Sequence, residues 1–215
     1  MIQNQFWKHK LQRCKTALEQ NNFEAFIADD PVGAKTLVID VILPKLGSEV
    51  VSWGDSMTLY TTGLLEYFTQ DDRFTVIETF APELSREDSI PRRRQALLAD
   101  LFLTGTNAVT ETGVLVNLDM IGNRVAGVTF GPRDVILFVG RNKIVRDVDT
   151  AMRRIKTFAA PMNAMRHNIK TPCVKTARCM DCASPVRICN TWTIHAKSYP
   201  QGRIKVVLIN QDFGL

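Results

Sequence analysis

Residues 100–113 carry the sequence DLFLTGTNAVTETG, an apolar run of strand length followed directly by small and polar residues. Open α/β sheets bind their ligands in the crevice at the carboxyl ends of the strands. We therefore predict a buried strand at 100–104 and, immediately after it, one wall of a ligand-binding pocket. The candidate ligand-binding residues of this wall are Gly105, Thr106, Asn107, Thr112 and Gly113.

Glu111 lies within the same wall and is the candidate catalytic residue. A carboxylate set between small residues can approach a substrate closely, either as a general base or as a nucleophile. The alternative interpretation is a turn in which Glu111 faces solvent or bonds to the backbone.

The sequence around this segment alternates between helix-like and strand-like stretches. The spacing of apolar residues predicts helices at 4–20, 32–46, 59–68 and from Asp147 or Asp149 to 158. Short apolar runs predict strands at 23–28, 50–53, 74–77 and 202–209. Pro91 is expected to break or begin a helix within 83–99. The alternation predicts an α/β fold with a mainly parallel, helix-covered sheet.

Between residues 113 and 145 the pattern changes. Three strand-like runs, 114–116, 125–128 and 135–139, are separated by turn residues that leave no room for helices. Gly122, Asn123 and Arg124 then form a hairpin turn. Alternatively, Arg124 pairs with a ligand carboxylate.

A second strand end has the sequence VSWGDSMT, residues 51–58. A strand, a glycine turn and a helix start can together hold an anion on free backbone N–H groups. The candidate ligand-binding residues here are Gly54, Asp55, Ser56 and Thr58. The competing interpretation is structural: Gly54 turns the chain, and Asp55 or Ser56 caps the helix.

Composition excludes several classes of protein. The 215 residues include 45% hydrophobic and 23% charged residues, which is typical of one globular domain spanning residues 1–215. The net charge of +5 and the short basic run at 92–94 are too small to predict a basic surface that binds nucleic acid. Because no apolar stretch reaches roughly 18 residues and no apolar signal core begins the chain, we expect no membrane span and a cytoplasmic location.

Four of the five cysteines are concentrated in one short segment. Cys173, Cys179, Cys182 and Cys189 have the spacing C-x5-C-x2-C-x6-C, within a cysteine-bearing segment at 171–190. Cytoplasmic thiols stay reduced, and a Cys-x2-Cys pair places two sulfurs on one metal. We therefore predict that the four cysteines bind a metal centre.

The spacing leaves the identity of that centre open. It matches neither paired zinc knuckles nor the bacterial ferredoxin run. The candidate cofactors are a [4Fe–4S] cluster or, alternatively, zinc, and free thiols or redox-switching disulfides are the remaining options. His167 and His195 flank the segment, and either is an alternative to one thiolate ligand.

Five stretches carry a family resemblance: 104–113 (TGTNAVTETG), 122–124 (GNR), 131–132 (GP), 139–145 (VGRNKIV) and 179–190 (CMDCASPVRICN). They resemble the lactate-utilisation (LUD) domain family over nearly the whole chain, and the cysteine segment is similar to a stand-alone, cysteine-bearing branch. The resemblance implies a three-layer α/β/α sandwich related to sugar-phosphate isomerases, glucosamine-phosphate deaminases and CoA-transferases.

The resemblance also implies functions. Some members belong to iron–sulfur systems that oxidise lactate to pyruvate, but those with a full electron-transfer role carry ferredoxin-type cysteine repeats, which this sequence lacks. In the related CoA-transferases a glutamate before a small residue and a glycine forms the acyl intermediate, and Glu111-Thr112-Gly113 is locally similar.

Three hypotheses result. The first is a protein that binds a small anionic metabolite and a four-cysteine metal centre and assists the oxidation of lactate or a related organic acid. The second is a non-enzymatic redox or metal-binding accessory subunit that docks on an oxidoreductase. The third is a CoA-transferase-like or isomerase-like enzyme that uses Glu111. A homo-oligomer is left open.

Overall fold

The computed structural model describes residues 2–81 and 83–215 and centres on a six-stranded sheet whose strands are all parallel. The strand order is β1-β10-β7-β4-β2-β3. Their bounds are β1 (Glu24–Ala28), β10 (Ile204–Ile209), β7 (Asp134–Gly140), β4 (Leu101–Gly105), β2 (Val50–Trp53) and β3 (Thr75–Ile77). Every strand predicted from a short apolar run outside the 113–145 block is present, and all their carboxyl ends lie at one edge of the sheet.

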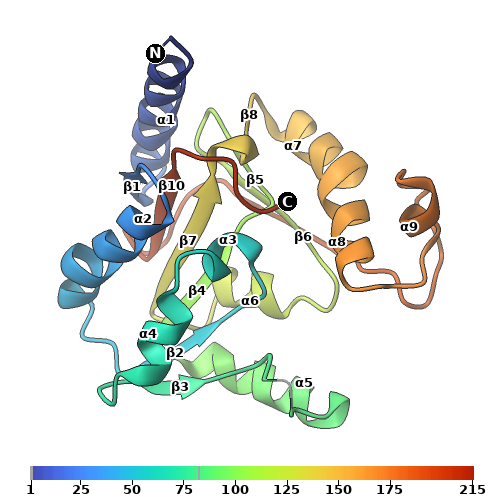
Figure 1. The fold of residues 1–215 in the computed structure, drawn as a ribbon, viewed down its shortest axis with the longest axis horizontal. Helices are drawn as coiled ribbons and strands as arrows, with labels where there is room; N and C mark the ends of the chain where they lie inside the picture. The colour runs from blue at the N-terminus through green and yellow to red at the C-terminus, as the bar shows by residue number, and fades with distance from the viewer. Residues whose placement is uncertain (1, 82) are drawn as a thin grey trace.

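A second sheet has the order β8-β5-β6-β9. It consists of β8 (Ile144–Val145), β5 (Ala108–Thr110), β6 (Leu115–Asp119) and β9 (Thr191–His195). β6 runs antiparallel to β5 and β9, whereas β5 and β8 are parallel. β5 begins three residues after β4 ends, so the chain passes directly from the edge of the large sheet into the small one (Figure 1).

Helices cover the large sheet and extend to one side of it. The helical segments are α1 (Ile2–Gln20), α2 (Pro31–Leu37), η1 (Val38–Ile42), η2 (Leu43–Lys45), α3 (Met57–Tyr60), α4 (Leu64–Gln70), α5 (Arg86–Gln95), η3 (Ala96–Leu98), α6 (Asn123–Thr129), η4 (Arg141–Lys143), α7 (Val148–Arg154), η5 (Ile155–Ala159), α8 (Ala160–Arg166) and α9 (Pro172–Thr176). Helices α7, α8 and α9 lie on the right in Figure 1, away from the large sheet.

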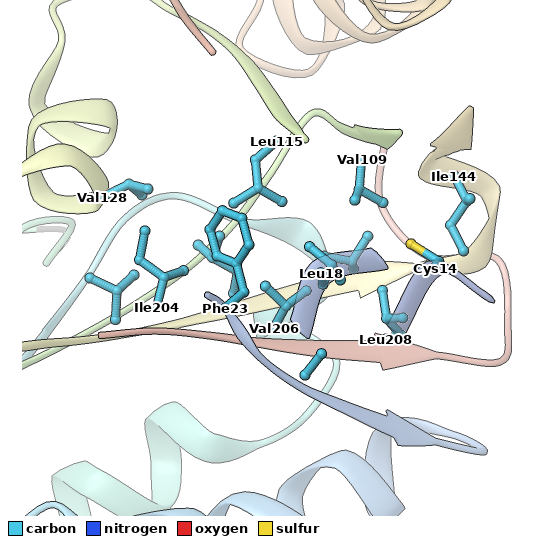
Figure 2. Packing of buried hydrophobic residues seen from close by; sticks show 14 of the residues in the cluster. Cys14, Leu18, Phe23, Val109, Leu115, Val128, Ile144, Ile204, Val206 and Leu208 are labelled. Carbon is cyan, nitrogen blue, oxygen red and sulfur yellow. The ribbon is translucent and has the colours of Figure 1, made fainter. Parts of the chain in front are cut away.

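Two cores hold the layers together. On one face of the large sheet, α1, α6 and the small sheet pack against β10 and β7, with Leu18, Leu115 and Val128 all buried (Figure 2). On the other face, α2, α3 and α4 pack against β2, β4 and β7, and Phe68 is buried there. The predicted three-layer α/β/α sandwich is therefore confirmed.

Side-chain caps fix the starts of several helices. Asp30 accepts a hydrogen bond from the N–H of Gly33 at 2.7 Å and begins α2. Asp147 accepts one from the N–H of Thr150 at 2.8 Å and begins α7. Both caps satisfy backbone donors that a helix start would otherwise leave unpaired, and the start of α7 at Asp147 is one of the two that the sequence predicts.

The prediction of a strand at 125–128 is wrong, because these residues form helix α6. Gly122 has a φ of +89°, which turns the chain, and Asp119 accepts a hydrogen bond from the N–H of Val125 at 3.1 Å. Val125 and Val128 are buried. The predicted hairpin turn at 122–124 is consequently the beginning of a helix, not a link between strands.

Two helix boundaries also differ from expectation. Pro91 lies inside α5, which continues to Gln95 rather than breaking. The predicted helix at 59–68 is divided into α3 and α4 by Gly63, whose φ of +67° is left-handed. Within the described residues, no helix combines the length and the apolar character that crossing a membrane requires.

Gly113 permits α1 to lie against the turn between β5 and β6. Its φ is +76°, and a Cβ atom at this position would lie 2.5 Å from the carbonyl carbon and oxygen of Ala17 in α1. We expect Gly113→Ala to lower the free energy of unfolding by about 3 kcal/mol, through left-handed strain and displacement of α1. Urea denaturation measures the change.

Gly122→Ala is the matched control. Gly122 is also left-handed, but a Cβ there would meet no atom within 4 Å. Its substitution is expected to cost only about 1 kcal/mol, from backbone conformation alone. Equal losses in the two variants would contradict the role of the α1 contact.

Candidate functional site

A pocket of about 360 Å³ lies at the carboxyl edge of the large sheet. We call it the strand-end pocket. It is bounded by the segments that follow β2, β4 and β7, by the start of α6 and by the end of α8. Its polar lining includes Asp55, Ser56, Gly105, Thr106, Asn107, Arg124, Lys143, Asn163, Arg166 and His167.

Six of the predicted site residues line this pocket: Asp55, Ser56, Gly105, Thr106, Asn107 and Arg124. Two others lie behind its surface. Gly54 packs so closely that a Cβ there would lie 2.8 Å from Thr104 Oγ1, and Thr58 accepts a hydrogen bond from Lys143 Nζ at 3.1 Å.

Ser56 has the structural role that was the alternative at sequence level. Its Oγ accepts a hydrogen bond from the N–H of Leu59 at 3.3 Å and caps α3. The neighbouring strand approaches so closely that a Cβ on Gly105 would lie 2.5 Å from this Oγ. Gly105 therefore brings β4 against the capped turn and forms part of the pocket floor.

Arg124 is buried, and its two terminal nitrogens donate to uncharged acceptors. Its Nη1 donates to Gly105 O at 3.2 Å and to Asn117 Oδ1 at 2.6 Å. Its Nη2 donates to Asn107 Oδ1 and to Leu118 O, both at 3.0 Å. Arg124 forms no ion pair with a carboxylate of residues 2–81 and 83–215. Its positive charge therefore remains unneutralised beside the pocket.

Lys143 is the most perturbed base of the pocket. It is 5% exposed, and it follows β7 directly, in η4. Burial, together with the charges of Arg154 and Arg124, lowers the pKa of Lys143 to about 7. The amine is therefore divided between its charged and neutral forms near neutral pH, and it can either donate or accept a proton.

Asp55 is held by three side chains. Arg166 binds both carboxylate oxygens, His167 Nε2 lies 3.0 Å from Oδ2, and Tyr60 donates to Oδ1 at 3.0 Å. Burial opposes ionisation, but the hydrogen bonds and charge of Arg166 outweigh it and hold the pKa of Asp55 below its ordinary value. These contacts join the β2 edge to α8.

Cations exceed carboxylates in the pocket lining that the structure describes. Arg93 and Arg166 add to Arg124 and Lys143, whereas the side-chain carboxylates are Asp55 and Asp119. Both oxygens of Asp119 accept backbone N–H groups, at 2.9 and 3.1 Å. The pocket is thus electropositive and suited to an anion.

The other predicted residues lie elsewhere. Glu111 forms an ion pair with Lys10 of α1 at 3.1 Å and is absent from the described pocket lining. The Thr112 hydroxyl lies 2.8 Å from that of Thr110, and Gly113 faces Ala17. The catalytic role of Glu111 stays a prediction, without a place in this pocket.

The four cysteines of the segment 171–190 line a second, much smaller cavity of about 20 Å³. We call it the cysteine cavity. Ile188 lines both the cysteine cavity and the strand-end pocket. Among the described residues, no three histidine, cysteine or acidic side chains are already arranged to hold a metal ion. The predicted metal centre therefore stays a prediction at this point.

Comparison with known proteins places the chain in a family. A family model described as the LUD domain matches residues 11–209. The chain belongs to the LUD domain family. The match includes the strand-end pocket loops and the cysteine segment.

Among solved structures, one of a DUF162 family protein from Deinococcus radiodurans is similar at 14% sequence identity and a TM-score of 0.48. The alignment covers 95% of this chain and 98% of that chain. The comparison with curated proteins gives no match. The LUD family is linked to lactate utilisation.

Sequence reasoning did not select Lys143 or Arg166 of this LUD protein. Lys143 had a usable signal, because the segment Arg141-Asn142-Lys143 comes directly after a predicted buried strand, just as Gly105 and Thr106 follow theirs. Arg166 had no such signal in the sequence, because α8 reaches the pocket only through tertiary packing.

The low pKa of Lys143 predicts how the stability of this LUD protein varies with pH. The pKa is about 7 when folded and 10.5 ordinarily. Below about pH 7 Lys143 is protonated in both the folded and the unfolded chain, so it does not make the free energy of unfolding depend on pH. Above about pH 7 the unfolded chain binds more protons than the folded chain. The free energy of unfolding therefore rises with pH, by at most about 1.4 kcal/mol per pH unit. We expect Lys143→Met to lose this rise.

Urea denaturation of the wild type and of Lys143→Met between about pH 6 and about pH 9 measures the difference. Other titrating groups contribute equally to both proteins, so the difference isolates Lys143. Parallel pH profiles would mean that the amine keeps an ordinary pKa in the folded chain.

Proposed function

We propose that the strand-end pocket binds a small anionic metabolite through a carboxylate or phosphate group. The observation that carries this proposal is the buried charge of Arg124, whose four hydrogen bonds all go to neutral oxygens. Burying a cation without an opposite charge costs free energy, and an anion in the pocket would offset that cost. Lys143 and Arg93 reinforce the same preference, whereas the charge of Arg166 is paired with Asp55.

A short hydroxy or oxo acid is the substrate class that we favour. The family's link with lactate utilisation supports it, and the pocket volume of about 360 Å³ leaves room for a compact acid or a larger one. The charge of Arg124 attracts the carboxylate through its field, because the terminal nitrogens of this guanidinium already donate to neutral oxygens. The amine of Lys143 can hold or release a proton beside the hydroxyl or oxo oxygen of the bound acid.

Titration calorimetry with L-lactate, pyruvate and inorganic phosphate tests the binding. At least one anion is expected to bind saturably, and lactamide, which lacks the charge, is expected not to bind. Lys143→Met should weaken binding about tenfold or more, because a buried charge-assisted hydrogen bond is lost. Lys15→Met, on the outer surface of α1, is the control and should bind as the wild type does.

Absence of binding by all three anions, or wild-type affinity in Lys143→Met, would remove the proposal. Strong binding of lactamide would also contradict it, since the argument depends on charge. Circular dichroism of each variant separates loss of a ligand contact from loss of the fold.

Anion binding is also expected to depend on pH. The pKa of Lys143 is about 7 in the free protein, and an adjacent anion favours the protonated amine, so binding takes up protons. The affinity should therefore fall as pH rises above about 7, by at most tenfold per unit. Calorimetry in two buffers of different ionisation enthalpy counts the protons, and a count of zero at about pH 8 would contradict a contact with Lys143.

A further inference from the structure

The cysteine segment connects α8 to β9, includes α9, and lines a cavity together with Ala160 and Pro161 of α8. Cys173, Cys179, Cys182 and Cys189 all line this cavity, although they are spread along the segment. Each is partly exposed and carries a free thiol. Because the fifth cysteine, Cys14 of α1, is buried in the core, the four thiols form a set that is distinct in space as well as in sequence.

The turn at Cys179 has a feature of thiolate metal sites. The backbone N–H of Asp181 donates a hydrogen bond to Cys179 Sγ at 3.5 Å. Asp181 has a φ of +48°, so the chain turns tightly between the two cysteines of the Cys-x2-Cys pair. Backbone hydrogen bonds to sulfur stabilise thiolate ligands and tune the metal they hold.

Two cations hold the loop in this shape. Lys156 and Arg187 both bind Asp181 Oδ1, at 2.8 and 2.9 Å. Arg187 also donates to the carbonyl oxygens of Cys182 and Cys189, at 2.8 and 2.9 Å. A single carboxylate neutralises only one of these two charges, so a net positive charge lies beside the thiols.

We propose that Cys173, Cys179, Cys182 and Cys189 hold one thiolate-ligated metal centre in the cysteine cavity. The ligand class is a thiophilic metal, either a single zinc ion or a [4Fe–4S] cluster. On binding, each thiol loses its proton to solvent and its sulfur forms a bond to metal. Four thiolates on either centre leave it with two net negative charges, and the positive charge of Lys156 and Arg187 that Asp181 does not neutralise offsets one of them.

The thiols must turn inward as the metal binds. In the described structure no three of them already converge, which is expected of free thiols, because they have no attraction that would draw them together. The four cysteines already line one cavity, so rotation of their side chains and a small tightening of the loop would bring the sulfurs together.

Metal and acid-labile sulfide analysis of protein purified anaerobically without a histidine tag tests the proposal. The expected result is either about one zinc without sulfide or about four irons with four sulfides per chain. Either result supports the site, and the sulfide content distinguishes the two centres. The double variant Cys179→Ser/Cys182→Ser should lose at least nine-tenths of the metal, whereas Cys14→Ala should retain it.

If the double variant does not fold, counting the reactive thiols of the wild-type protein provides a second test of the metal site. In the wild type as purified, a thiol reagent should find the four cysteines protected, and a strong chelator should make them reactive together. Reactive thiols before chelation, with no metal taken up on reconstitution with zinc or with iron and sulfide, would overturn the proposal. Full metal content in the double variant would overturn it equally.

Discussion

The guanidinium of Arg124 organises the edge of the sheet where the pocket lies. Its hydrogen bonds reach the end of β4 at Gly105, the following Asn107, and Asn117 and Leu118 of β6. Asn117 Oδ1 also accepts the backbone N–H of Asn107 at 3.1 Å. Arg124, supplied by α6, therefore links the two sheets by hydrogen bonds in addition to the apolar packing between them.

Burying the charge of Arg124 costs free energy, and this charge also affects the ionisation of Lys143 nearby. A buried guanidinium satisfied by neutral oxygens keeps its hydrogen bonds but not a neutralising charge. Its field reaches Lys143, whose pKa is lowered by burial and then by Arg154 and Arg124. Proteins commonly tolerate such unfavourable electrostatics where a site must attract a ligand, which is why perturbed ionisation indicates function.

The fold followed from the sequence wherever local pattern and burial agreed. Mainly apolar runs such as 135–139 and 202–209 identified two strands that the structure places in the parallel sheet, because such strands are buried on both faces. The same reasoning failed at 125–128, where a short valine-rich run suits a strand equally well. A tertiary contact, the hydrogen bond from Val125 N–H to Asp119, accompanies the helix there.

Part of the pocket was predictable from the predicted strands, because residues that follow parallel strands lie at one edge of the sheet. Residues that follow strands in sequence, such as Asp55 and Thr106, lie at the predicted edge, since parallel strands end together. Glu111 was selected from local composition, but β5 carries it away from that edge to Lys10. His167 was considered only as a metal ligand, and its contact with Asp55 depends on how α8 packs.

Ile188 separates the strand-end pocket from the cysteine cavity and contacts both. A shared wall makes the two cavities thermodynamically linked whenever filling one of them displaces it. The coupling free energy is then the same in both directions, so a ligand that alters affinity for metal is itself altered by the metal to an equal degree. Ile188 is thus the side chain through which an anion in the strand-end pocket and a metal in the cysteine cavity, both proposed above, would affect each other's binding.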